Sequence, residues 1–440
     1  SFLQNPNEQD MPGNILISDC GSLEVGTTAT PGDLIQKQGM LHINSGTVHV
    51  TGNHDLSTGS VLELGAGSVL EVDGNFVKNS GTGASYTEGT IKVGKDVDLR
   101  DSFNGTENFR LIMNGNDGQK IISKNSRNKL NVQLEGRNVT TVGAFEPTLY
   151  SGGAITPDGG TLVVTGLKVN GCELKVNGDV EASGKVDVGG KTGRLEVMGD
   201  YVQPSDYLKL NGGEVIIGGD YRIQKKGNDG KYSVGLGGLI MDNPNPKEPS
   251  TSRLTVNGSL YMESSNASRY SYWGTMTVKG NIEQKKAGGF DKFDGYGDFR
   301  LILAGDGPQT VSIESKDSVL NQLELKNQNV TVKGYLNAKL AADGTISLPA
   351  QGSLELTGLE LQGNKLTIKG GTDSLVKASG NVDIGGSGGH LVVPGDFMQS
   401  SGILRIGEGT MDVGNDLLIM DKDDNKNYKT GEGSLIMTGS

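Results

Sequence analysis

The sequence predicts an all-β protein, a single-stranded parallel β-helix (β-solenoid) of right-handed sense with about 20–22 residues per coil. Three observations predict it: a strand phrase recurring about every twenty residues, a longer repeat of about 190 residues, and the lack of a sustained helical period. Glycine supplies 70 of 440 residues, about twice the usual share of about 7%. Only 34% of residues are hydrophobic and 5% are aromatic. Such a core suits thin stacked layers of small aliphatic side chains.

The short repeat consists of an aliphatic, a polar and an aliphatic residue, any residue, then glycine followed by Asp, Asn or another polar residue. It occurs at residues 70–75, 174–179, 195–200, 215–220 and 391–396. Each phrase predicts a strand with Leu195 and Val197 inward and Glu196 outward. The corner after each strand is expected to use a glycine with positive φ. Steps of 20–22 residues separate most of these corner glycines from the next one. The 39 residues from Gly219 to Gly258 count as two steps. About 21 coils are therefore expected.

The long repeat lies on top of the short one. Residues 109–115 with Gln119 return as 299–305 with Gln309, an offset of 190, and residues 186–190 return as 382–386, an offset of 196. We expect one continuous β-solenoid over 1–440, with an irregular or capping start over 1–40, a first long repeat over 89–273 and a second over 274–440, truncated at its C-terminal end. The last coil is then open, and its partner is expected to be the chain's own continuation or another copy, associated end to end or laterally.

Several strings resemble the repeat region of very large bacterial secreted or surface proteins, similar to filamentous-haemagglutinin-type adhesins. They are residues 218–224, 238–241, 274–284 and 299–311. The resemblance covers the chain from about residue 40 onward. It implies a β-helix rod, secreted or on the bacterial cell surface, that serves adhesion, display of terminal domains or fibre formation. It supplies no catalytic motif.

Charge and cysteine usage exclude several classes of function. The net charge is −12, which disfavours nucleic-acid binding. No apolar run approaches the roughly 18–20 residues that span a bilayer, so membrane insertion is not expected. The two cysteines, Cys20 and Cys172, form neither a disulfide framework nor a metal motif. They are expected to lie too far apart to bond to each other.

Corner carboxylates are the first candidate for chemistry. Asp179, Asp200 and Asp220 would stack about 5 Å apart, a separation compatible with a glycosidase pair or with Ca²⁺ ligands. Asn, Ser and Lys occupy the same corner in other coils. Because a turn tolerates that exchange and acid–base catalysis does not, the structural interpretation is favoured.

A second candidate resembles a calcium loop. Asp421, Asp423, Asn425 and Glu432 occupy positions 1, 3, 5 and 12 of such a loop, and Asn427 position 7, but Lys426 replaces the glycine at position 6. A solvated insertion is favoured over a Ca²⁺ site. No other cofactor is expected.

Aromatic residues, histidines and one glycine-rich turn complete the candidates. Tyr270, Tyr272 and Trp273 are either a ligand-contact surface, as for a stacked sugar, or packing under the insertion that carries Phe290, Phe293 and Tyr296. The four histidines, His42, His49, His54 and His390, are expected to point outward into solvent. Residues 189–192 imitate the end of a phosphate loop without the required first glycine.

The favoured function is structural and not enzymatic: an extracellular rod or fibre segment of a bacterial surface protein, with any adhesion to a host or environmental glycan or protein residing on outward loops or distal domains. The alternative is a β-helical polysaccharide-binding or polysaccharide-degrading enzyme, such as a lyase or a tailspike-like depolymerase. That alternative needs clustered carboxylates, cations and aromatic residues in one groove.

Overall fold

The computed structural model describes residues 15–18, 20–79, 81, 83–242, 247–266, 270–287, 293, 297–327, 329–348, 352–422, 428–429 and 432–436, with the side chains of 83–85, 270–272, 421–422, 428–429, 432–434 and 436 outside that description. The described residues contain no helix, and their strands form a β-solenoid of about 18 turns. The predicted fold class is confirmed. The chain divides into two compact units, residues 1–199 and 200–440, which are described separately.

The described residues of the first unit form 23 strands. They are β1 Ile15–Ile17, β2 Ser22–Val25, β3 Leu34–Gln36, β4 Gly39–Ile43, β5 Thr47–Val50, β6 His54–Leu56, β7 Ser60–Leu64, β8 Val69–Val72, β9 Phe76–Lys78, β10 Gly83–Val93, β11 Val97–Leu99, β12 Gly105–Met113, β13 Lys120–Ser123, β14 Lys129–Gln133, β15 Asn138–Val142, β16 Glu146–Ser151, β17 Gly153–Pro157, β18 Thr161–Val164, β19 Leu167–Lys168, β20 Glu173–Val176, β21 Asp179–Ala182, β22 Val186–Asp187 and β23 Arg194–Val197.

The second unit contains the remaining strands of the described residues. They are β24 Tyr201–Val202, β25 Ser205–Lys209, β26 Glu214–Ile217, β27 Tyr221–Ile223, β28 Lys225–Lys226, β29 Tyr232–Ser233, β30 Leu236–Met241, β31 Arg253–Val256, β32 Leu260–Met262, β33 Tyr270–Tyr272, β34 Thr275–Val278, β35 Ile282–Gln284, β36 Arg300–Leu303, β37 Gln309–Ile313, β38 Leu320–Leu325, β39 Val330–Leu340, β40 Gly344–Ser347, β41 Ser353–Glu360, β42 Lys365–Lys369, β43 Leu375–Ala378, β44 Val382–Asp383, β45 His390–Val393, β46 Asp396–Gln399, β47 Ser401–Arg405, β48 Thr410–Val413, β49 Leu417–Leu418, β50 Asp421–Lys422, β51 Tyr428–Lys429 and β52 Glu432–Ile436.

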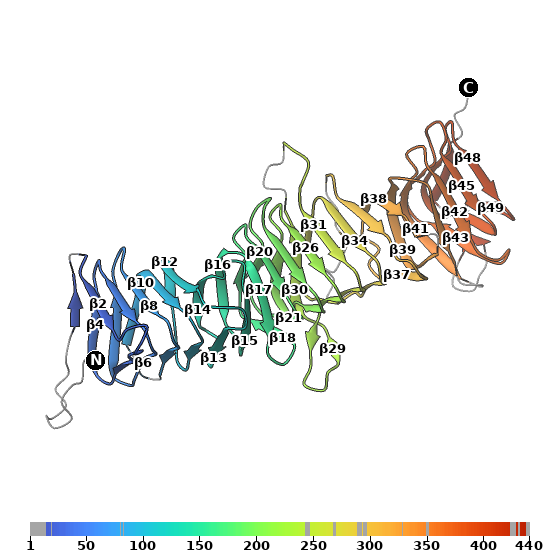
Figure 1. The fold of residues 1–440 in the computed structure, drawn as a ribbon. Coiled ribbons are helices and arrows are strands. Elements are labelled where there is room, and N and C mark those ends of the chain that lie inside the picture. The colour runs from blue at the N-terminus through green and yellow to red at the C-terminus, as the bar shows by residue number, and fades with distance from the viewer. Residues whose placement is uncertain are drawn as a thin grey trace. The chain divides into compact units, whose positions relative to one another are not determined.

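A typical coil contributes three short strands, and each strand pairs in parallel with the strand about three positions later in the chain. In the first unit β2 pairs with β5 and β5 with β8, while β3 pairs with β6 and β6 with β9. Figure 1 shows the strands stacked in this way within each unit. Within residues 1–40, expected to be an irregular or capping start, the described residues form β1–β3, which pair with β4, β5 and β6.

The count of about 18 turns falls below the expected 21 because insertions lengthen individual coils. Val215 pairs directly with Leu254, 39 residues later, so the spacing that was counted as two steps is a single coil. The additional residues include an antiparallel hairpin of β28 and β29. This hairpin projects from the stack of its unit in Figure 1.

In-register stacking builds the core as predicted. Leu174 pairs with Leu195 and Val176 with Val197, and all four side chains are fully buried. Glu196, between the two buried residues of β23, is only partly buried. A row of identical or similar aliphatic side chains therefore runs from coil to coil, and burial of their apolar surface holds the stack together.

The corner glycines occur where the sequence places them, but the expected reason was wrong. Gly178, Gly258 and Gly280 do not have positive φ. Each instead lies against the corner of the preceding coil: the amide of Gly280 donates to the carbonyl of Gly258 at 2.8 Å. A Cβ at Gly280 would lie 2.5 Å from that carbonyl oxygen. Glycine is required because the backbones of neighbouring coils touch at this corner.

Gln119 explains one of the repeated sequence strings. Its buried Nε2 donates to the carbonyls of Val93 at 2.9 Å and Lys95 at 2.5 Å. Its Oε1 accepts from the amide of Gly115 at 2.9 Å. The side chain thus adds a hydrogen bond to each of three backbone groups at one coil corner, where the Val93 carbonyl also accepts from the amide of Asn114.

Gln309 makes the same three bonds in the second unit. Its Nε2 donates to the carbonyls of Val278 at 3.0 Å and Gly280 at 2.6 Å, and its Oε1 accepts from the amide of Gly305 at 3.4 Å. The 190-residue offset therefore repeats a structural feature as well as a sequence string. We call this feature a glutamine bracket: a buried glutamine side chain that hydrogen-bonds to three backbone groups.

Candidate functional site: corner ladders, hairpins and a polar groove

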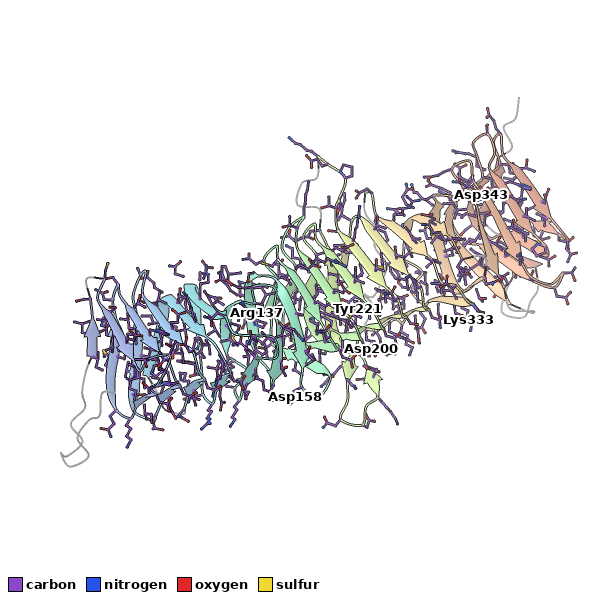
Figure 2. All side chains as sticks on the ribbon, in the orientation of Figure 1. Arg137, Asp158, Asp200, Tyr221, Lys333 and Asp343 are labelled. Carbon is purple, nitrogen blue, oxygen red and sulfur yellow. The ribbon has the colours of Figure 1, made fainter. Side chains whose placement is uncertain are left out.

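The corner carboxylates serve the backbone of the following coil. In the second unit, Asp200 Oδ1 accepts from the amide of Asp220 at 2.7 Å, and Asp220 Oδ1 accepts from the amide of Ser259 at 2.8 Å. Ser259 Oγ in turn accepts from the amide of Asn281 at 3.0 Å. Asp200 is labelled in Figure 2. The corner therefore needs a short side chain with an acceptor oxygen, which Asp, Asn and Ser all supply.

The first unit has the same ladder with a different mixture of residues. Asp33 Oδ1 accepts from the amide of Asn53 at 2.7 Å, Asn53 Oδ1 from that of Asn75 at 2.9 Å, and Asn75 Oδ1 from that of Asp96 at 3.0 Å. Among the described residues no group of three or more His, Cys, Asp or Glu side chains could hold a metal ion. These contacts support the structural interpretation of the corner residues.

The segment that resembles a calcium loop includes a β-hairpin. Asp421 in β50 lies opposite Lys429 in β51, and Glu432 belongs to the next strand, where it pairs with Ser401. Asp423 and Asn425 lie outside the described residues, as do the side chains of Asp421 and Glu432. The calcium prediction therefore stays untested.

This hairpin is the counterpart of the β28–β29 hairpin. Lys225 pairs with Ser233 there, and the pairing of Asp421 with Lys429 is the same register displaced by 196 residues. The long repeat thus duplicates the hairpin position, although the aligned loop residues differ in charge.

Arg222 fixes the base of the first of these hairpins. Its guanidinium carbon lies 4.3 Å from the ring centroid of Tyr232 on the hairpin and 3.8 Å from that of Tyr261 on the next coil. Its Nη2 also lies 2.6 Å from Asp220 Oδ2. An arginine between two aromatic faces gains cation–π attraction on both sides, so this residue couples the hairpin to the solenoid wall.

The aromatic candidates divide between described and undescribed side chains. Tyr270 and Tyr272 lie in β33, in register with Leu239 and Met241, and their side chains lie outside the described residues, as do Phe290 and Tyr296. Trp273 is described, and its indole packs against Gly297, where any Cβ would collide with the ring. Phe293 is buried. These contacts of Trp273 and Phe293 support the packing interpretation.

Three of the four histidines lie outward beside carboxylates. His49 Nε2 lies 3.0 Å from Asp73 and His390 Nε2 lies 2.7 Å from Asp412, while His42 lies 3.7 Å from Glu63.

His54 contradicts the expectation of an outward histidine, because it is fully buried in β6. It pairs in register with Phe76, and the two rings meet edge to face with centroids 5.7 Å apart. Burial lowers the pKa of His54 to about 4, and neither ring nitrogen has a hydrogen-bond partner. The alternation of His54, Asp55 and Leu56 is the signal that could have placed it inward.

The glycine-rich segment 189–192 and the two cysteines are the remaining features that the sequence singled out. Gly189 and Gly190 have positive φ, and Thr192 Oγ1 donates to the carbonyl of Gly171 at 2.9 Å, so residues 189–192 form a turn between β22 and β23. Cys20 and Cys172 are both free thiols. The described part of the chain contains no helix long and apolar enough to cross a membrane.

Sequence reasoning did not find a polar groove of about 320 Å³ on the second unit. Four strands stacked one on the next each contribute one outward residue to its lining. These residues are Lys339 of β39, Glu360 of β41, Asp383 of β44 and Arg405 of β47, and they pair in register. Lys339 Nζ lies 2.9 Å from Glu360, and Arg405 Nη1 lies 3.7 Å from Asp383. The spacings of 21, 23 and 22 residues are the sequence signal for this row.

The hollow results from a bend in β41. Leu336 pairs with Leu356 but Asn337 pairs with Gly358, so Thr357 is an extra, bulged residue. Gly358 contributes no side chain between Asn337 and the next coil, where Asn381 Oδ1 accepts from a backbone amide at 3.0 Å. Thr357 lines the groove, and its Oγ1 is buried without a protein partner.

None of the protein-family models, curated proteins or solved structures compared with this chain matches it.

Proposed function

We propose that this chain is a structural segment of a secreted bacterial surface protein, an extracellular β-solenoid stalk or fibre segment that presents loops or distal domains to partners. Its partners would be further coils of the same polypeptide, other copies of the chain, or a host or environmental glycan or protein. The resemblance of residues 218–224 and 299–311 to adhesin repeats supports the surface location.

The observation that carries the proposal is that polar groups at the coil corners bond to the next coil. The acceptor oxygens of Asp200 and Asp220 each take a backbone amide of the following coil. Gln309 brackets three backbone groups. Side chains arranged in this way supply the coil-to-coil cohesion that a load-carrying solenoid requires.

An enzymatic role receives less support from the same residues. A general acid or base must exchange a proton with substrate. Asp220 instead accepts a hydrogen bond from one backbone amide, and its carboxylate lies 2.6 Å from the guanidinium of Arg222. These two contacts use one carboxylate oxygen each, Oδ1 and Oδ2, so both oxygens already serve the solenoid wall. A structural protein is therefore the better proposal than a lyase or depolymerase.

The proposal is tested in two ways. An antibody against the chain, applied to intact and to permeabilised cells of the source organism, should label both equally if the protein lies at the surface. The purified chain should release no reducing ends from a panel of polysaccharides. Labelling that requires permeabilisation, or turnover of any polysaccharide, would contradict the proposal.

A further inference from the structure

The groove on the second unit combines hydrogen-bond donors and acceptors in one row. Lys339 and Arg405 supply cationic donors at the two ends, and Glu360 and Asp383 supply neighbouring acceptors between them. The four side chains are 40–51% exposed, so a ligand can reach them. Successive groups belong to strands about 4.8 Å apart.

The charges of this row cancel, which selects the class of ligand. A polyanion would meet Glu360 and Asp383, and a polycation would meet Lys339 and Arg405. A neutral ligand with many hydroxyl groups avoids both repulsions, because each hydroxyl can donate to a carboxylate and accept from a cation.

The first long repeat provides a natural comparison for this groove. Thr148, Lys168 and Asp187 hold the in-register positions that correspond to Lys339, Glu360 and Asp383. The first copy therefore has a single carboxylate, Asp187, where the second copy has two on neighbouring strands.

Asp187 also has a different neighbour. Lys185 stands where Asn381 stands in the second copy, and its Nζ lies 2.8 Å from Asp187. The strand framework is shared, and the balanced row of charges belongs to the second copy alone.

We propose that the groove lined by Lys339, Thr357, Glu360, Asp383 and Arg405 binds a neutral oligosaccharide along the stacking direction of the coils. No aromatic ring belongs to the groove lining, so stacking adds nothing and a single groove should bind weakly, with a Kd of about 1 mM. Display of many copies would convert such contacts into useful avidity. This binding site is additional to the structural role proposed above. If the binding proposal is disproved, the structural proposal still stands.

The test uses the full chain and saturation-transfer NMR with cellohexaose, maltohexaose and laminarihexaose as neutral probes, and with a tetragalacturonate as the anionic probe. We expect at least one neutral hexasaccharide to bind and the galacturonate not to bind. The double variant Glu360→Gln/Asp383→Asn should weaken neutral binding at least tenfold. It should also acquire binding of the galacturonate, because Lys339 and Arg405 then lose their counter-charges.

The matched control is Lys168→Gln/Asp187→Asn in the first copy, which should leave neutral binding unchanged. Circular dichroism and the melting temperature establish that both double variants remain folded. Absence of binding to all three neutral probes would overturn the proposal. So would preferential binding of galacturonate by the unmodified chain, or equal loss of binding in the control.

Discussion

Gln119 in the first long repeat and Gln309 in the second make the same three backbone bonds, whereas the outward positions of the two copies have diverged. Lys168 of the first copy corresponds to Glu360 of the second, and Lys185 to Asn381. The fully buried Gln203 and Gln399 repeat the same pattern, each donating to a serine carbonyl at 2.6 Å. Buried polar groups are retained because leaving their backbone partners unpaired is costly. Outward groups can change because water satisfies them.

The largest expected effect comes from placing a charge in the shared core. Val197 and Val393 occupy corresponding positions, 196 residues apart, and are almost fully buried. Replacing either with Asp would bury an unpaired carboxylate and lower the free energy of unfolding by about 3 kcal/mol or more. Glu196→Lys and Val392→Lys, on the outward face, should change it little. Urea denaturation of the four variants measures this, and equal losses for inward and outward substitutions would disprove the strand register.

His54 sharpens the comparison because it is a buried polar side chain whose ring nitrogens have no hydrogen-bond partner, in a coil that precedes both long repeats. Its pKa is lowered from 6.5 to about 4, so between those values the unfolded chain binds a proton that the folded chain does not. Stability should therefore fall as the pH drops from about 6.5 to about 4, by about 3 kcal/mol at most. The variant His54→Phe should lose this part of the pH dependence.

Melting temperatures from pH 7.5 to pH 4 would measure the effect of His54. His390→Gln, which alters an outward histidine, serves as the control and should retain the decline that His54 causes. If His54→Phe shows the same decline as the unmodified chain, the ring is not held neutral in the core.

The next effect in size is the loss of a glutamine bracket. Gln309→Leu keeps most of the side-chain volume but leaves the carbonyls of Val278 and Gly280 and the amide of Gly305 without this partner. We expect a loss of about 2 kcal/mol, and the same loss for Gln119→Leu. Chemical denaturation of both variants measures it. A large loss in one copy and none in the other would show that the copies are not energetically equivalent.

Period and alternation were sufficient to predict the fold class and the core rows, because stacked coils repeat the same backbone environment. Residues such as Leu195 and Val197 follow directly from that rule. The 39-residue coil was miscounted because a projecting hairpin adds residues without adding a coil. The positions of the corner glycines were predicted correctly, but the predicted reason, a positive φ, was wrong. The actual reason is the backbone contact between residues such as Gly258 and Gly280, which depends on how closely neighbouring coils approach each other.

The groove was less accessible to sequence reasoning. Its charged row has the spacing of a coil, but so do many other outward rows of the solenoid. The hollow depends on the bulge at Thr357, and a pattern of alternating residues does not reveal a bulge. Where the side chains of the candidate residues are described, as for Asp200, Asp220 and Trp273, their contacts support turn or packing roles, because short polar and aromatic side chains can serve structure as well as ligand binding.

The smallest expected effect concerns the two hairpins, which share a register and differ at their base. Arg222 lies between Tyr232 and Tyr261 in the first copy, and Leu418 holds the corresponding position in the second. Tyr232→Leu should remove one cation–π contact, worth about 1 kcal/mol at a partly exposed site. Local opening of the hairpin should then become about fivefold more frequent, since 1.4 kcal/mol is a factor of ten. Hydrogen exchange of the amides in 225–233 measures this opening, with residues 253–256 of β31 as the internal reference. Unchanged protection of 225–233 would show that strand pairing alone holds the hairpin, and accelerated exchange in β31 as well would show that Tyr232 supports the coil rather than the hairpin.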